Sequence, residues 1–116
     1  MRQRRRAEQK GRWAERYSAW TLRFKGYKIL EQRYKTPVGE IDLIAKQGHL
    51  LVFVEVKARA TIDAGLASIS YRQKDRIKRA ALLYCQKIYH KGAVRFDAMV
   101  KADDHFFVKH IEAAWR

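Results

Sequence analysis

Two apolar segments that carry charged residues constrain this chain more than any other feature. In Val38–Ala45, apolar and charged residues alternate with a period of two, which is typical of a strand whose two faces have different surroundings. One face carries Ile41, Leu43 and Ala45, and the other carries Glu40, Asp42 and Ile44. Leu50–Val56 is apolar on both faces, which is typical of a central strand covered on both sides. The segment between them predicts a tight turn in which Gly48 can adopt positive φ.

The turn determines which charged residues meet. With Gln47 and Gly48 as the loop, the expected opposed pairs are Lys46 with His49, Asp42 with Phe53, and Glu40 with Glu55. At the end remote from the turn, one side of the hairpin then gathers Glu40, Asp42, Glu55 and Lys57. Crowded carboxylates favour a divalent cation, Mg²⁺ or Mn²⁺, and a lysine beside them could stabilise an anion or orient a water. Exposed cross-strand ion pairs are the alternative interpretation.

The segments GEIDLIA and LVFVEVKAR, in this order and at this separation, resemble the YraN-like family of predicted endonucleases. An acidic residue in one strand followed by Glu-x-Lys at the end of the next also resembles the PD-(D/E)XK, restriction-endonuclease-like superfamily. The resemblance implies that Asp42 and Glu55 bind the metal ion with help from the carbonyl of Val56. It also implies that Lys57 contacts the attacking water or the phosphate.

The segment from about residue 7 to residue 25 is expected to form a helix that Gly26 terminates. Its aromatic residues recur at helical spacing on one face, namely Trp13, Tyr17, Trp20 and Phe24. This face exceeds what one small sheet needs, so we expect it to contact a second subunit, giving a homodimer, or to stack on bases. Glu15 lies on the side opposite to these aromatic residues, and the resemblance implies that it completes the acidic cluster. A surface ion pair of Glu15 with Arg12 or Arg16 is the alternative.

Charge points to the kind of partner. The 116 residues include 26 Lys and Arg against 12 Asp and Glu, a net charge of +14, which favours DNA or another nucleic acid. The single cysteine, Cys85, excludes an internal disulfide and suggests a reducing compartment. No segment is long and apolar enough to span a bilayer, so no membrane is expected and the cytoplasm is the predicted location.

Residues 60–70 are rich in small side chains, and we expect a loop that borders the site and orders on substrate. Ser70 and Gln73 form a capping-box pattern at the start of a second long helix. The expected nucleic-acid contacts are Arg59, Arg72, Gln73, Lys74, Arg76, Lys78 and Arg79. A solvated basic face is the alternative, and the resemblance leaves open whether Gln73 or Lys74 acts at the site.

Two further strands are expected at residues 94–100 and 105–111, with Asp97 in a structural ion pair with Arg95 or a helix arginine. Residues 1–6 are expected to form a basic flexible tail and residues 7–116 a single domain. This order predicts an α/β fold, and the resemblance implies a restriction-endonuclease-like α-β-β-β-α-β core with a mixed central sheet flanked by helices. The expected function is a metal-dependent DNA endonuclease acting on branched or structured DNA. A non-catalytic nucleic-acid-binding module with a vestigial nuclease site is the alternative.

Overall fold

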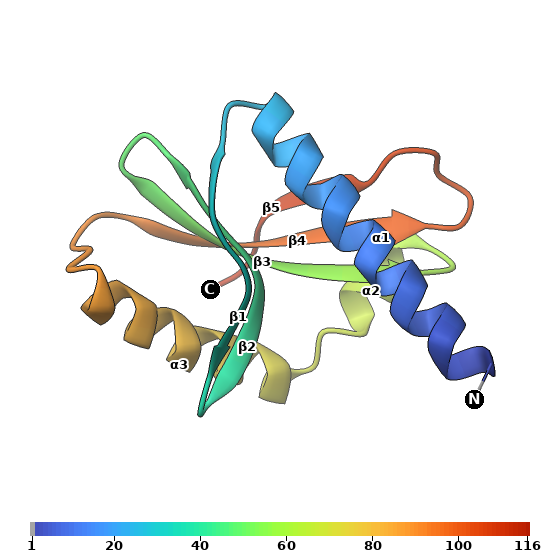
Figure 1. Cartoon of the computed structure of the whole chain (residues 1–116), viewed down its shortest axis with the longest axis horizontal. Coiled ribbons are helices and arrows are strands. Elements are labelled where there is room, and N and C mark those ends of the chain that lie inside the picture. The colour runs from blue at the N-terminus through green and yellow to red at the C-terminus, as the bar shows by residue number, and fades with distance from the viewer. Residues whose placement is uncertain (1) are drawn as a thin grey trace.

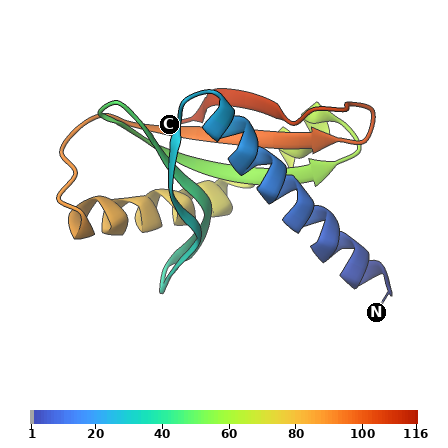
Figure 2. The same cartoon turned by 45° about the horizontal axis from the view of Figure 1, so that its top comes forward.

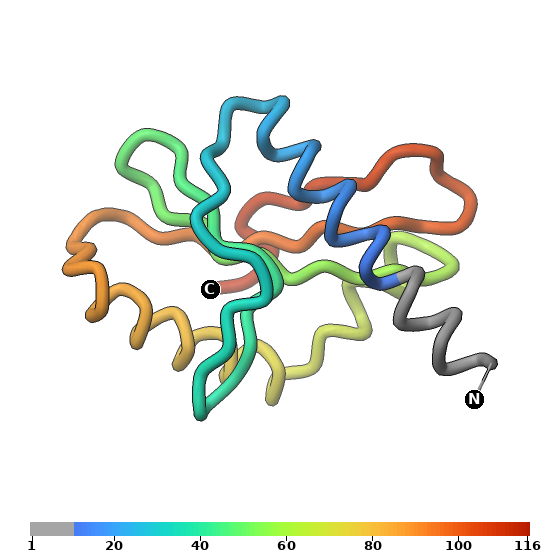
Figure 3. The backbone as a smooth tube through the Cα atoms, viewed as in Figure 1, coloured from blue at the N-terminus to red at the C-terminus, as the bar shows by residue number. Residues whose placement is uncertain are grey.

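One amino-terminal helix, three strands, two helices and two strands follow one another along the chain (Figure 1). They are α1 (Arg2–Phe24), β1 (Lys28–Thr36), β2 (Gly39–Gln47), β3 (Leu50–Arg59), α2 (Ile62–Ala67), α3 (Tyr71–Lys87), β4 (Val94–Ala102) and β5 (Lys109–Trp115). The computed structural model describes the backbone from residue 2 onward and the side chains from residue 11 onward (Figure 3). Met1 and the side chains of the expected tail, residues 1–6, lie outside the described residues, so its flexibility stays a prediction.

All five strands belong to one sheet with the spatial order β1-β2-β3-β4-β5. β3 and β4 are parallel and the other neighbours are antiparallel, which confirms the predicted mixed sheet. The connection between the parallel strands carries α2 and α3, because parallel neighbours need a crossover. β5 begins four residues later than expected, since the turn after β4 is held by hydrogen bonds from the Asp103 amide to the carbonyls of Arg59 and Ala60.

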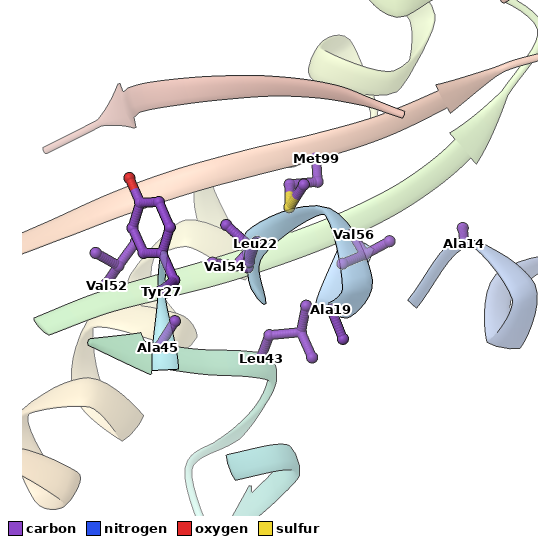
Figure 4. Close-up of a cluster of buried hydrophobic side chains, with 10 residues drawn as sticks. All are labelled: Ala14, Ala19, Leu22, Tyr27, Leu43, Ala45, Val52, Val54, Val56 and Met99. Carbon is purple, nitrogen blue, oxygen red and sulfur yellow. The ribbon is translucent and has the colours of Figure 1, made fainter. Parts of the chain in front are cut away.

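The two long helices cover opposite faces of the sheet (Figure 2). The α1 face buries Ala14, Ala19, Leu22, Tyr27, Leu43, Ala45, Val52, Val54, Val56 and Met99 (Figure 4). The α3 face buries Ile41, Ile44, Leu51, Phe53, Ile77, Ala80, Ala81 and Tyr84. Side chains of β3 alternate between these two clusters, which confirms that β3 is a central strand covered on both sides.

The β2–β3 turn lies one residue later than predicted, which changes the register of the two strands by two residues. Gly48 and His49 form the loop, and Gly48 has the expected positive φ, 59°. Ile44 therefore lies opposite Phe53, and continuing this register puts Asp42, not Glu40, level with Glu55. The predicted pairs were wrong, but a slip of two residues does not by itself move a side chain to the other face.

One side chain of β2 does change face. Ile41 was expected beside Leu43 but lies in the α3 cluster. Opposite this part of β2, Arg33 has a φ of 52°, a left-handed conformation, between the paired residues Gln32 and Tyr34 of β1. The β2–β3 ladder ends at Leu43 and Val54. Asp42 thus lies at the point where β2 leaves β3.

The segment expected as a loop at residues 60–70 contains a short helix, α2, whereas the prediction that it orders on substrate stays a prediction. Thr61 caps α2, accepting a hydrogen bond of 3.0 Å from the amide of Ala64. Gly65 is buried against β4, where an added Cβ would come within 2.3 Å of Val100 Cγ1. A cap and this close packing hold the segment in place.

The aromatic face of α1 remains exposed, as predicted. The exposed fractions are 60% for Trp13, 52% for Tyr17, 67% for Trp20 and 97% for Phe24. In the described part of the chain, none of the helices combines the length and the apolar character needed to cross a membrane.

Candidate active site

Asp42 closes the end of the β2–β3 ladder with its side chain. The amide of Val56 donates a hydrogen bond of 2.8 Å to Asp42 Oδ2. A carboxylate thus stands beside β3 just past the last paired residues of β2. The strand pattern of the sequence continues through Asp42 without a break. The hydrogen bond from Val56 to Asp42 is therefore visible only in the structure.

Glu55 is a buried acidic residue next to Asp42. It lies in β3 on the face covered by α3, with an exposed fraction of 4%. Burial, and then the charge of Asp42, raise the pKa of Glu55 from 4.5 to about 9. Burial likewise raises the pKa of Asp42, and the two carboxyl groups are close enough to share a hydrogen bond. The pair therefore holds a proton at neutral pH.

Lys57 and Gln73 both reach Glu55 Oε1. Lys57 Nζ lies 3.6 Å away, and Gln73 Nε2 donates a hydrogen bond of 3.1 Å. Ser70 caps α3 by accepting from the Gln73 amide at 3.1 Å, which confirms half of the capping box. The Gln73 side chain does not complete the box because it turns to Glu55 instead. Lys74 Nζ lies 5.4 Å from the ring centroid of Tyr71, so Gln73, not Lys74, contacts the acidic pair.

Glu15 approaches Asp42 from the α1 face, where its negative charge adds to the effect of burial in raising the pKa of Asp42. Its partner is neither Arg12 nor Arg16. Arg33 Nε donates a hydrogen bond of 2.8 Å to Glu15 Oε2, and this bond raises the pKa of Arg33. Sequence reasoning missed Arg33, which has no distinguishing neighbours in β1; only its unusual φ and its acidic surroundings mark it.

The predicted acidic cluster is only partly assembled. Glu40 is exposed at the start of β2, away from the Asp42–Glu55 pair in register. Within residues 11–116, no three side chains of His, Cys, Asp or Glu converge as they would around a metal ion. The structure thus brings together Asp42, Glu55 and Lys57, with Gln73 added, and holds Glu15 in an ion pair with Arg33.

The predicted nucleic-acid contacts lie mainly on the outer surface of α3. Exposed side chains are Arg59, Arg72, Arg76, Lys78 and Arg79, while Gln73 and Lys74 are partly buried. Arg79 Nε forms an ion pair of 3.1 Å with Asp75, one turn earlier in α3. These residues form a basic surface beside the amino-terminal end of α3, next to Gln73.

Asp97 has the structural role that the sequence predicts. It is fully buried and accepts two hydrogen bonds of 2.7 Å from Arg95, one of 2.7 Å from His110, and one of 3.0 Å from the Ala113 amide. Burial opposes its charge, but the bonds from His110 and Arg95 outweigh burial and lower the pKa of Asp97. Its carboxylate thus ties β4 to β5 on the α1 face.

The sheet is mixed and has helices on both faces. At the end of its central strand, Glu55 pairs with Asp42 of β2 and is followed by Lys57. This is a restriction-endonuclease-like architecture. The particular family is also shown. Residues 14–100 match the model of Uncharacterised protein family UPF0102, and the chain belongs to this family, the YraN-like family expected from its motifs.

Relatives in several bacteria support this assignment. A UPF0102 protein of Maricaulis maris is 44% identical over 116 residues, which cover 98% of this chain and 91% of the relative. A UPF0102 protein of Bartonella tribocorum is 46% identical over 97 residues, 82% of this chain and 75% of the relative. One from Thermodesulfovibrio yellowstonii is 38% identical over 107 residues, 90% of this chain and 94% of the relative.

Proposed function

We propose that this protein is a metal-dependent endonuclease that hydrolyses phosphodiester bonds in DNA. The observation that carries the proposal is the Asp42–Glu55 pair, in which Glu55 is buried and Asp42 is half-buried, with Lys57 beside it. Two adjacent carboxyl groups destabilise each other when both are charged, so a purely structural role gives no reason to retain them. A divalent cation would make both charges favourable.

The residues present fit Mg²⁺ or Mn²⁺ through oxygen donors. Asp42 and Glu55 would hold the ion together with the carbonyl of Val56, whose amide already fixes Asp42. A divalent cation there lowers the pKa of a bound water and stabilises negative charge on phosphoryl oxygens. Glu15 would join these ligands if its hydrogen bond with Arg33 were broken. Glu40 lies two residues before Asp42 in β2, so we do not expect it among the first ligands of the ion.

Lys57 and Gln73 would complete the site around Glu55. Lys57 carries a positive charge 3.6 Å from Glu55 Oε1, so it could contact the phosphate or hold the attacking water. Gln73 Nε2 donates to the same oxygen and would fix the rotamer of Glu55, leaving Oε2 for the ion. Lys57 would therefore act on the reacting groups, and Gln73 would act by positioning Glu55.

The surface charge supports a polyanionic substrate. A net charge of +14 attracts a phosphate backbone, and the exposed basic residues of α3 lie on the helix whose first turn supplies Gln73. DNA bound along α3 would thus pass close to Glu55 and Lys57. We propose a branched or structured form of DNA as substrate.

A second candidate function is a non-catalytic nucleic-acid-binding module with a vestigial site. The ion pair between Glu15 and Arg33 favours it, because it engages the carboxylate that would be the third acidic ligand. Within the described side chains, no third acidic group replaces it. The basic surface would serve this function equally well.

Cleavage assays separate the two functions. Labelled linear, flapped and four-way DNA would be incubated with Mg²⁺ or Mn²⁺ and either the wild type, Glu55→Gln or Lys57→Ala. We expect the wild type to cleave at least one of these substrates, and each variant to lose about a hundredfold or more in rate, since Glu55→Gln would lose a ligand of the ion and Lys57→Ala would lose the positive charge beside the reacting phosphate. DNA affinity in EDTA should stay within about threefold.

Glu112→Gln is the matched control, because it makes the same substitution at an exposed glutamate on β5. This variant should cleave as the wild type does. Cleavage that survives Glu55→Gln would contradict the proposed site. Tight DNA binding by a wild type that cleaves none of the substrates with either metal would favour the non-catalytic module.

A further inference from the structure

The exposed side of α1 carries aromatic residues that neither the fold nor the candidate active site uses. Trp13, Tyr17, Trp20 and Phe24 each leave more than half of their surface exposed, from 52% to 97%. Trp13 and Tyr17 stack with ring centroids 5.2 Å apart. Large aromatic side chains exposed in a row are unfavourable in water, so this surface needs an explanation beyond packing. We call these four residues the aromatic row.

A row of arginines runs along one edge of the aromatic row. Arg12, Arg16 and Arg23 are spaced by four and seven residues, which places them on one line of a helix. All three are exposed, and the Arg23 guanidinium lies 5.2 Å from the ring centroid of Trp20. Aromatic planes beside a line of guanidinium groups match the bases and the phosphates of a nucleic-acid strand.

The arginine row leads toward the candidate active site. A cavity of about 310 Å³ is lined by Arg12, Glu15, Arg16, Gln32 and Arg33. Three of these five side chains are arginines, and Glu15 is the acidic residue that approaches Asp42. A phosphate bound by these arginines would lie next to the acidic residues that the proposed reaction uses.

The aromatic row is extended on its other side by the β4–β5 loop. Tyr17 and Phe106 both line a groove of about 410 Å³, and Phe106 and Phe107 have exposed fractions of 87% and 79%. The rings of Phe106 and Phe107 meet edge to face with centroids 5.0 Å apart. Exposed aromatic surface thus continues from α1 onto the neighbouring loop.

We propose that the aromatic row and the arginine row bind single-stranded nucleic acid, with bases stacked on the aromatic rings and phosphates on the arginines. A second copy of the chain would also bury aromatic surface. However, it would bring together two molecules of charge +14 through a face that carries three arginines in each. A polyanion removes that repulsion, and single strands expose the base faces that duplexes hide.

This inference concerns binding and stands whether or not the acidic pair cleaves. Its link to catalysis rests on the proposed function: a substrate with a single-stranded segment, bound along α1, would have a phosphate beside Glu15. A flap or a junction provides such a segment. The aromatic row would then determine which part of a structured substrate reaches the site.

Fluorescence anisotropy in EDTA tests the binding without any cleavage. A labelled single-stranded oligo(dT) and a duplex of equal length would be titrated with the wild type, the Trp13→Ala/Trp20→Ala double variant and the Trp13→Phe/Trp20→Phe double variant. We expect the alanine variant to lose about tenfold or more in single-strand affinity and the phenylalanine variant to stay within about threefold, because stacking needs a ring and not indole itself. Duplex affinity should change less than single-strand affinity.

Tyr89→Ala is the matched control, since Tyr89 is an aromatic residue with an exposed fraction of 87% just after the end of α3, outside the aromatic row. It should leave single-strand affinity unchanged. Unchanged affinity in the alanine double variant would overturn the proposal. So would light scattering that shows a wild-type dimer which this variant dissociates, because the aromatic row would then be an interface between copies.

Different results would contradict the endonuclease proposal and the aromatic-row proposal. Cleavage without single-strand binding along α1 would remove the aromatic-row proposal and leave the endonuclease. Single-strand binding without cleavage of any substrate would remove the endonuclease and leave the aromatic row. Thermal unfolding of each aromatic-row variant checks that it is folded, which is expected because the substituted aromatic side chains are exposed.

Discussion

Glu55 couples protonation to folding. Its pKa of about 9 in the folded chain lies above the ordinary 4.5. The folded chain therefore keeps a proton that the unfolded chain releases. This proton contributes stability in full below about pH 4.5, and that stability is lost as the pH rises toward 9.

Replacing Glu55 by glutamine should remove this pH dependence. Between pH 6 and pH 8.5, we expect the free energy of unfolding of the wild type to fall by about 1–3 kcal/mol relative to Glu55→Gln, because glutamine has no proton to lose. Urea unfolding of both proteins in EDTA measures the difference. Parallel curves for the two proteins across this range would show that Glu55 is not a buried acid.

Arg33 illustrates what a sequence pattern cannot reveal about a single residue. Its neighbours in β1 give no sign that it lies near three acidic residues, Glu15, Glu40 and Asp42. They come from α1 and β2, and only the tertiary fold brings them near the strand. Asp42, Glu55 and Lys57 were predictable because their own segment carries the signal, a charge inside an apolar strand.

At the scale of elements, the β2–β3 hairpin shows which structural features a strand pattern determines. The faces were predicted because side chains alternate with a period of two, and Ile41 alone departs from them in β2. The register was not predicted correctly, since a slip of two residues buries the same faces. Gln73 shows the same limit: its capping-box spacing is correct, but the helix end competes for that side chain with Glu55.

The short helix α2 depends on a glycine for its place against the sheet. Gly65→Ala should lower the free energy of unfolding by about 1–3 kcal/mol, because the new Cβ would meet Val100 Cγ1 at 2.3 Å. Gly11→Ala is the control, since it makes the same change in a helix with no atom within 4 Å of the new Cβ. This control should be neutral or stabilising by less than about 1 kcal/mol. Equal effects of the two substitutions would contradict the packing of α2 on β4.

At the scale of the whole molecule, the candidate site lies where β2 and β3 separate within the mixed sheet. The β2–β3 ladder ends at Leu43 and Val54, so Asp42 and Glu55 face each other just beyond the last ladder pair. Glu15 approaches from the α1 face and Gln73 from the α3 face. The order of elements and the mixed sheet were predictable from the sequence, whereas this convergence of two faces depends on where the β2–β3 ladder ends.

Calorimetric titration of Mg²⁺ and Mn²⁺ into the wild type and Asp42→Asn tests most directly whether the acidic pair is a metal site. We expect the wild type to bind with release of about one proton at pH 7, because Glu55 must ionise, and to bind more tightly as the pH rises toward 9. Asp42→Asn should lose this binding. Titrations in buffers of different ionisation enthalpy measure the number of protons released on metal binding. A wild type that binds neither metal at any pH up to 9, even with DNA present, would contradict the metal site.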